Sequence, residues 1–134
     1  MVELFVVGAH LSGQPLAWQL ADRGSTLAGA ARTTREYRLV ALGTEPPKPG
    51  LVRVGAGGAS IEGERWLVPV GAFGSFVAGI PSPLAIGKVA LDDGSLVCGF
   101  LCESWAADVA EDITAFGGWR SYLASVAGPS GSAG

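Results

Sequence analysis

The Asp93-Gly94 pair restricts the folds open to this chain more than any other feature of its sequence. It joins two runs that are rich in apolar and β-branched residues, 84–92 and 95–103. An Asp-Gly pair in this setting is a strong signal for a β-hairpin with a two-residue turn. We therefore expect an antiparallel pair of strands over this segment.

The rest of the chain consists of short apolar runs separated by glycine, proline and polar turns. The run at 3–7 is typical of a buried strand, and Pro15 and Gly24 suit the two ends of a following helix. Three prolines and one glycine make 44–50 a stiff loop. Further strands are expected at 25–34, 37–43, 51–54 and 60–70, a weak helix at 70–79, an extended link at 80–84, and helical pieces over 104–128 that Gly117 and Gly118 interrupt.

These elements predict a single α+β domain. Six or seven strands paired mostly by short turns, with two or three short helices, are typical of a small, mostly antiparallel mixed β-barrel. A chain of 134 residues can bury one core but not two independent ones. We assign residues 1–127 to this domain and residues 128–134 to a flexible tail.

Composition and charge argue against several functional classes. The formal net charge is −3 and no basic run could follow a phosphate backbone, so nucleic acid is not an expected partner. No apolar stretch is long enough for a membrane helix and no signal-peptide pattern is present, which predicts a cytoplasmic protein. Cys98 and Cys102 are expected to be buried free thiols. With one histidine and no CxxC pair, neither a metal nor another cofactor is expected.

His10, the only histidine, lies in a turn between the first strand and the following helix. Gly8 and Gly13 bracket this turn, and such a turn can direct backbone N–H groups towards an anion. An imidazole there could act as an acid or a base near neutral pH. We expect the ring at the base of a pocket, within reach of the N–H groups of residues 8–13. The alternative is a hydrogen-bonded structural histidine.

Several cationic side chains could hold an anion beside that turn. Lys48 lies between two prolines, which fix its position, and the alternative is a solvated surface lysine. Arg32 and Tyr37 belong to neighbouring strands, together with further arginines at 35, 38 and 53. An anionic ligand needs two or three such donors that converge. The carboxylates that could face the pocket are Glu62, Glu64 and Glu103, although ordinary surface charges are the alternative.

Five segments of the chain resemble the C-terminal domain of allophanate hydrolase, in the same order and with similar spacing. They are VVGAHLSGQPLAWQL (6–20), ARTTREYRLVAL (31–42), PPKPGLVRV (46–54), FVAGIPSPLAIGKVALDDGSLVCGFLCE (76–103) and DITAFGGWRSYL (112–123). The resemblance implies a fold like that of the γ-glutamylcyclotransferases, in which the loop after the first strand contacts the ligand. That loop is formed here by Gly8, Ala9, His10 and Leu11.

The resemblance also implies an activity. The family's domain is expected to release carbon dioxide from N-carboxycarbamate, the product of an amidase, with the loop histidine, here His10, as the critical residue. Arg32, Tyr37 and Lys48 are our candidates for holding this small anionic substrate. Because the chain shows no Ser-Ser-Lys amidase machinery, the preceding step is expected from a separate amidase protein.

Two other functions stay open at this point. The chain could be a non-catalytic subunit that binds a small acid or docks onto an amidase. It could instead be a cyclotransferase-like enzyme, although Pro81, Ser82 and Pro83 lie where that family has its catalytic glutamate. The sequence also leaves open a homodimer.

Overall fold

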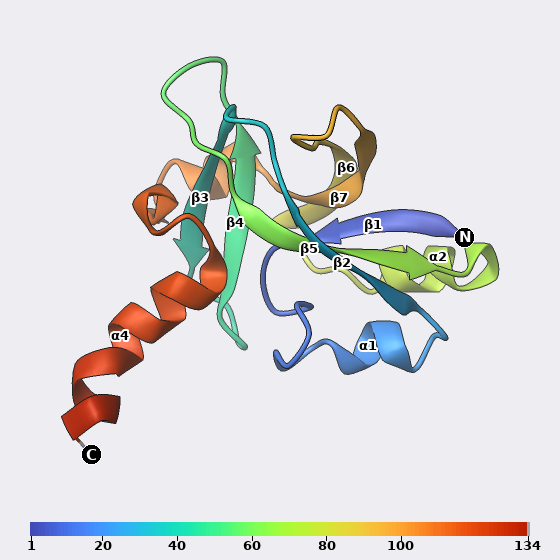
Figure 1. Cartoon of the computed structure of the whole chain (residues 1–134), viewed down its shortest axis with the longest axis horizontal. Coiled ribbons are helices and arrows are strands. Elements are labelled where there is room, and N and C mark those ends of the chain that lie inside the picture. The colour runs from blue at the N-terminus through green and yellow to red at the C-terminus, as the bar shows by residue number, and fades with distance from the viewer. Residues whose placement is uncertain (134) are drawn as a thin grey trace.

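The computed structural model describes the backbone of residues 1–133 and the side chains of residues 1–127. Within this part of the chain there are eight strands and four helices, most of the helices short. Figure 1 shows how they are arranged. Their bounds are β1 (Val2–Val6), α1 (Trp18–Ala21), β2 (Thr26–Arg32), β3 (Tyr37–Leu42), β4 (Lys48–Arg53), β5 (Glu62–Val68), α2 (Val70–Ala78), β6 (Leu84–Ala90), β7 (Leu96–Cys102), α3 (Ser104–Ala107), β8 (Glu111–Asp112), a 3₁₀ turn η1 (Thr114–Phe116) and α4 (Trp119–Ala133).

The strands form two sheets. The larger sheet has the order β2-β5-β1-β7-β6, and the smaller sheet has the order β4-β3-β8. All neighbouring strands are antiparallel except β1 and β7, which pair in parallel. The predicted α+β class with a mostly antiparallel arrangement is therefore confirmed. The two sheets do not close into one continuous barrel, because β2 and β6 remain the edges of the larger sheet.

β1 is the central strand of the larger sheet and the centre of the core. Leu4, Phe5 and Val6 have no exposed surface, which explains why the run is apolar without alternation. Gly63 of β5 and Gly99 of β7 lie on either side of Phe5. A Cβ atom at Gly63 would collide with the Phe5 ring and the Val6 carbonyl oxygen, and one at Gly99 would collide with the Val89 side chain and lie 3.1 Å from the Phe5 carbonyl oxygen. The neighbouring strands thus leave room for a large side chain in the middle strand.

The predicted hairpin is confirmed, but its turn is longer than two residues. β6 and β7 pair from Leu84 opposite Cys102 to Ala90 opposite Leu96. The N–H of Gly94 donates to the carbonyl of Leu91, and Gly94 has a φ of 91°. A single glycine with positive φ after a tight turn makes the hairpin loop that is next in frequency to the two-residue type.

The boundaries of several other elements differ from those predicted. β4 begins at Lys48 rather than after residue 50, since an edge strand tolerates the proline at 49. The helix expected over 15–24 has only one α-helical turn, α1. β8 was not expected. Gly117, with a φ of 77°, separates η1 from α4 as predicted. Among the described residues, no helix is long and apolar enough to span a membrane.

α4 reaches Ala133 and so includes most of the segment assigned to a tail. The domain boundary at 127 and the flexibility of the residues after it stay predictions.

Tyr37 lies in the core rather than in a binding site. Its side chain is fully buried, and its hydroxyl oxygen accepts a hydrogen bond from the N–H of Ala90 at 2.9 Å. The guanidinium of Arg53 lies over the ring, 5.9 Å from its centre. Tyr37 therefore joins β3 of the smaller sheet to the end of β6 in the larger sheet, which corrects the prediction that it holds an anion.

Replacing Tyr37 tests this structural role. The variant Tyr37→Phe keeps the ring but leaves the N–H of Ala90 without its acceptor, so we expect the free energy of unfolding to fall by about 1–2 kcal/mol. Chemical denaturation measures this change. A drop in anion binding, with unchanged stability, would contradict the structural role.

Candidate functional site

The loop after β1 is a tightly closed turn that shapes the floor of a cavity. The N–H of Leu11 donates to the carbonyl of Gly8 at 2.9 Å, and the N–H of Leu16 donates to the carbonyl of Ala9 at 2.8 Å. Gly13 has a φ of 82°, which the chain needs in order to turn towards α1. Gly8 and Ala9 line the cavity. The side chain of Leu11 is buried in the core and does not line the cavity, contrary to the prediction.

The smaller sheet reaches this loop through Pro49. A Cβ atom at Gly8 would overlap the Pro49 ring, so the absence of a side chain at Gly8 lets β4 lie directly against the loop. This contact brings Lys48, the residue before Pro49, beside His10. The cavity therefore forms where the two sheets meet.

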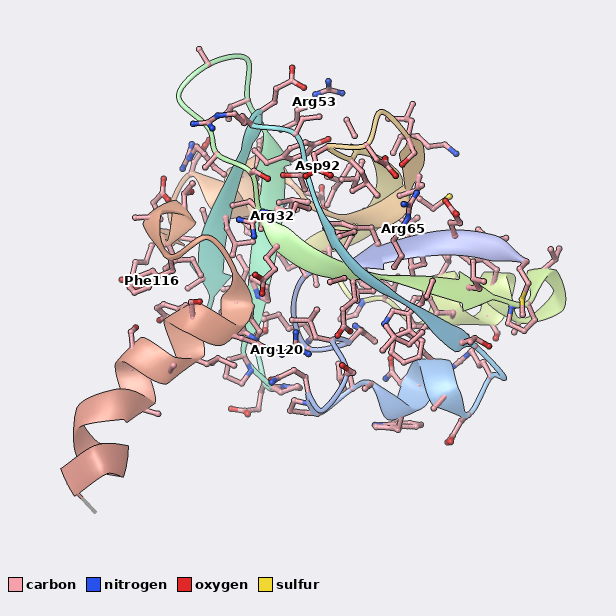
Figure 2. All side chains as sticks on the ribbon, viewed as in Figure 1. Arg32, Arg53, Arg65, Asp92, Phe116 and Arg120 are labelled. Atoms are coloured by element: carbon pink, nitrogen blue, oxygen red, sulfur yellow. The ribbon has the colours of Figure 1, made fainter. Side chains whose placement is uncertain are left out.

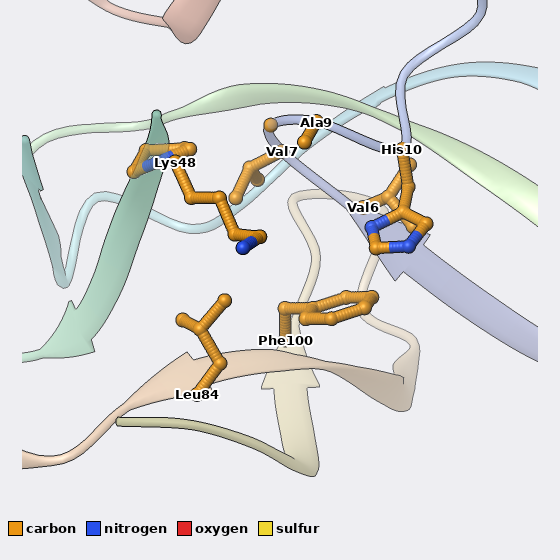
Figure 3. Close-up of a pocket in the computed structure, with 9 residues that line it drawn as sticks. Val6, Val7, Ala9, His10, Lys48, Leu84 and Phe100 are labelled. Atoms are coloured by element: carbon orange, nitrogen blue, oxygen red, sulfur yellow. The ribbon is translucent and has the colours of Figure 1, made fainter. Parts of the chain in front are cut away.

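The cavity has two lobes. The inner lobe, of about 10 Å³, lies against the backbone of the loop and Pro49. The outer lobe, of about 220 Å³, lies between the start of α1 and the segment after α2. Figure 3 shows the inner lobe with Lys48 and His10 on opposite sides and Phe100 and Leu84 below them. The four residues that line both lobes are His10, Lys48, Leu84 and Phe100.

His10 is buried and held on three sides. Its ring stacks on Phe100 at 4.9 Å and meets the edge of Phe76 at 5.2 Å, measured between ring centres. Its Nε2–H donates to Oε1 of Gln19 at 2.8 Å. The ring's hydrogen-bond partner in the described part of the chain is thus Gln19, not the loop N–H groups that we expected. This bond makes Nδ1 the nitrogen that gains or loses a proton.

Burial lowers the pKa of His10 below its ordinary value of 6.5, and the positive charges of Lys48 and Arg23 lower it further. The hydrogen bond to Gln19 acts in the opposite direction but does not restore the ordinary value. His10 is therefore neutral at pH 7.

Lys48 is a buried cation without a counter-charge. Only 6% of its surface is exposed, and within residues 1–127 its side chain has neither an ion pair nor a hydrogen bond. No carboxylate lines either lobe of the cavity. Because the side chain is largely buried and no anionic partner for it is found within residues 1–127, its ammonium group favours an anion in the cavity.

The other predicted cations lie elsewhere. Arg32, at the end of β2, is exposed, and its guanidinium is 3.4 Å from the carboxylate of Glu62. It borders a separate surface hollow that it shares with Asp92, and Figure 2 shows both residues. The structure thus brings His10 and Lys48 together with Gly8 and Ala9, but separates Arg32 from them. Neither Arg32 nor Tyr37 lines the cavity, which corrects the predicted set.

Glu64 holds the loop after β1 in place through hydrogen bonds to Ser12. Its carboxylate accepts hydrogen bonds from the N–H of Ser12 at 2.7 Å, from the Ser12 hydroxyl at 2.6 Å and from Arg120 at 3.2 Å. Arg120, at the start of α4 in Figure 2, also donates to the carbonyl of Ser12 at 2.7 Å. Burial of Glu64 raises its pKa, but the hydrogen bonds from Ser12 and Arg120 outweigh burial and hold the pKa below its ordinary value.

Glu103 has no comparable position. It is exposed at the start of α3, and its carboxylate is 3.4 Å from the hydroxyl of Ser82. Like Glu64, it does not line the cavity. The candidates for a pocket carboxylate are therefore structural or surface groups.

Gln19 is a polar residue of the cavity that is absent from the predicted set. It lies nine positions after His10 and is the only polar residue of α1, a helix of four residues. A single amide side chain on a short apolar helix directly after the loop is a sequence feature that indicates a residue near the cavity. The wall residues Ile80 and Phe100 carried no such signal, because apolar residues in a strand or link are ordinary core residues.

The arrangement of the strands and helices defines a class of protein. It is that of the γ-glutamylcyclotransferase fold: a structure described as "Gamma-glutamyl cyclotransferase" superposes with a TM-score of 0.57 at 14% identity, covering 83% of this chain and 69% of the other. At that identity the likeness concerns the fold alone.

The chain belongs to the allophanate hydrolase C-terminal domain family, whose model matches residues 2–124. It is 43% identical over 127 residues to a urea amidolyase of Lachancea kluyveri, and the match covers 91% of this chain and 7% of that protein. It superposes on an allophanate hydrolase of Kluyveromyces lactis with a TM-score of 0.89 at 43% identity, covering 93% of this chain and 21% of the other. The chain thus spans a small part of these relatives.

A third match is of similar length to this chain. The uropathogenic E. coli-specific protein c4763 is 34% identical with a TM-score of 0.85, and the match covers 91% of this chain and 94% of that one. The resemblance predicted from the sequence is therefore confirmed.

Acid should weaken the hydrogen bonds that the Glu64 carboxylate accepts from Ser12 and Arg120. Its pKa in the folded chain is below the ordinary value of 4.5, so its stabilising effect is complete above that value and is lost as the pH falls through the folded pKa. We expect Glu64→Gln to reduce stability by about 1–3 kcal/mol at pH 7 and to flatten the fall in Tm between pH 5 and pH 3. Thermal melts at several pH values measure both effects.

The matched control is Glu62→Gln, which changes an exposed carboxylate on the same strand. It should leave the pH dependence of the Tm close to that of the parent. If Glu62→Gln and Glu64→Gln flattened the curve equally, Glu64 would have no special part in it.

Proposed function

We propose that this cavity binds N-carboxycarbamate and catalyses its decarboxylation, the second step of allophanate breakdown, after a separate amidase has produced it. The observation that carries the proposal is the pairing of an uncompensated buried cation, Lys48, with a neutral buried imidazole, His10, in a cavity without carboxylates. Membership of the allophanate hydrolase C-terminal domain family supports the same substrate.

Binding is the first role of the site. The ammonium group of Lys48 pairs with one carboxylate of the dianion, which replaces the water that both groups lose on burial. The inner lobe has room for about one water-sized atom, such as a carboxylate oxygen, beside the backbone of Gly8 and Ala9. The second carboxylate then lies towards His10, on the other side of the cavity.

Proton transfer is the second role. A bound dianion favours the charged form of a neighbouring imidazole and so raises the pKa of His10, which takes up a proton on Nδ1. That proton passes to the carbamate nitrogen as the bond from nitrogen to one carboxylate carbon breaks. The electron pair of that bond stays on nitrogen, and the departing carboxylate becomes carbon dioxide. The remaining product is carbamate.

Gln19 is a positioning residue in this proposal. Gln19 accepts a hydrogen bond from the Nε2–H of His10, so Nδ1 is the nitrogen that exchanges the proton. The same bond holds the ring against Phe100. The hydrogen bond also partly offsets the lowering of the pKa by burial, so the imidazole is easier to protonate when substrate arrives.

A cyclotransferase reaction fits this cavity less well. That family resemblance calls for a glutamate after α2, and in this chain Ile80 and Pro81 form the cavity wall there. A non-catalytic binder of small acids is the second candidate, because a neutral His10 beside Lys48 is sufficient to bind an anion. Variants of the two residues distinguish binding from catalysis.

The variants His10→Asn and Lys48→Ala should have opposite effects. We expect His10→Asn to abolish decarboxylation of N-carboxycarbamate supplied by a separate amidase, while malonate binding changes little. Lys48→Ala should weaken malonate binding by about 1.5–3 kcal/mol, because it removes a charge-assisted hydrogen bond. Calorimetry and a coupled assay measure these effects. Lys88→Ala, which removes an exposed lysine, is the control. Decarboxylation at the parent rate by His10→Asn would show that the imidazole is structural, whereas malonate binding by a parent chain that does not accelerate decarboxylation would identify a non-catalytic binder.

Malonate binding should also take up protons. Without malonate, His10 is unprotonated at any pH above its lowered pKa. Bound malonate raises this pKa, so protons are taken up at pH values between the pKa of the free site and that of the occupied site. Below the pKa of the free site His10 is already protonated and uptake vanishes. Calorimetry at pH 7 in two buffers of different ionisation enthalpy should give a positive number of protons for the parent and none for His10→Asn. Equal binding enthalpies in both buffers for the parent would contradict the coupling.

A further inference from the structure

The outer lobe of the cavity is larger than a molecule as small as N-carboxycarbamate requires. A single water needs about 10–15 Å³ of such space, so a lobe of about 220 Å³ has room for on the order of ten to twenty non-hydrogen atoms. One dianion held between Lys48 and His10 occupies only its inner end. The rest of the lobe extends away from the charged groups, between α1 and the segment after α2.

The walls of this remaining space are apolar. Leu16 precedes α1, Pro46 precedes β4, and Ile80 and Pro81 follow α2, while Leu84 and Phe100 form the inner end. Apart from Gln19, whose amide oxygen is engaged by His10, the polar side chains of the lobe are His10 and Lys48 themselves. A pocket with a few polar groups at one end and apolar walls elsewhere favours a ligand that has a polar group at one end and an apolar group at the other.

We propose that the outer lobe is a binding site for an uncharged, apolar substituent, so that the natural ligands include small carboxylates or carbamates that carry a short alkyl or similar group. This inference rests on the proposed anion site at Lys48 and His10. The anionic head pairs with Lys48, and the substituent lies against Ile80, Leu16 and Pro81, where it displaces water from apolar surface.

A series of substituted malonates tests this proposal on the full chain. Malonate, ethylmalonate and butylmalonate share the anionic head and differ only in the length of the alkyl group. Each buried carbon of the alkyl group should tighten binding by roughly three- to fourfold. Butylmalonate should therefore bind roughly tenfold tighter than malonate if two of its four alkyl carbons are buried, and roughly a hundredfold tighter if all four are. Calorimetry should also give an increasingly negative heat capacity change along the series, because apolar surface is buried.

Variants place the alkyl group in the lobe. Ile80→Asn should remove most of the preference for butylmalonate over malonate while malonate affinity stays near that of the parent. Val70→Asn, which changes an exposed residue of α2 outside the cavity, is the matched control and should keep the full preference. Lys48→Ala should weaken all three ligands by a similar factor, since each is held by its anionic head.

The outcomes separate this inference from the proposed function. Malonate binding with no gain, or with a loss, along the alkyl series would overturn the apolar subsite and leave the anion site intact. Failure of all three ligands to bind would overturn both. Butylmalonate binding that does not depend on Lys48, or a preference that survives in Ile80→Asn, would also overturn the subsite, because the alkyl group would then bind elsewhere.

Discussion

The contact between Gly8 and the Pro49 ring is the constraint on which the rest of the site depends. It joins the loop after the central strand of the larger sheet to an edge strand of the smaller one. Gly50 makes a second close approach, because a Cβ atom there would lie 2.7 Å from the Cβ of Cys102. Where strands meet this closely, Lys48 and His10 line the same cavity from opposite sides.

This packing determines the electrostatics. Lys48 and His10 are both largely buried on opposite sides of the cavity, and the positive charge of Lys48 disfavours the charged form of His10. The result is an imidazole that faces a lysine across the cavity and whose pKa lies below its ordinary value. The carboxylate that could have neutralised them, Glu64, points to Ser12 and Arg120 instead, where it fixes the loop without entering the cavity.

The fold itself does not select the chemistry. The same framework is shared with a γ-glutamyl cyclotransferase at 14% identity, and function depends on the side chains that the framework presents. In this chain the framework presents a histidine in the loop after β1, a lysine from the edge strand and an apolar wall at Ile80 and Pro81. Those side chains, rather than the topology, are the basis on which we propose a site that binds an anion and moves a proton.

The sequence by itself determined the features that depend on neighbouring residues: the hairpin of β6 and β7, the break at Gly117, and the place of His10 in a glycine-flanked turn after β1. Local turn chemistry and apolar runs are sufficient for these. Only the tertiary structure decided which distant groups meet. The parallel pairing of β1 with β7, the burial of Tyr37 against Ala90 and the separation of Arg32 from the cavity are contacts between segments far apart in the chain. The alternation of side chains along a strand shows which residues share a face of the sheet. It does not show which face a second sheet will cover, so the packing of the two sheets decided where each candidate cation points.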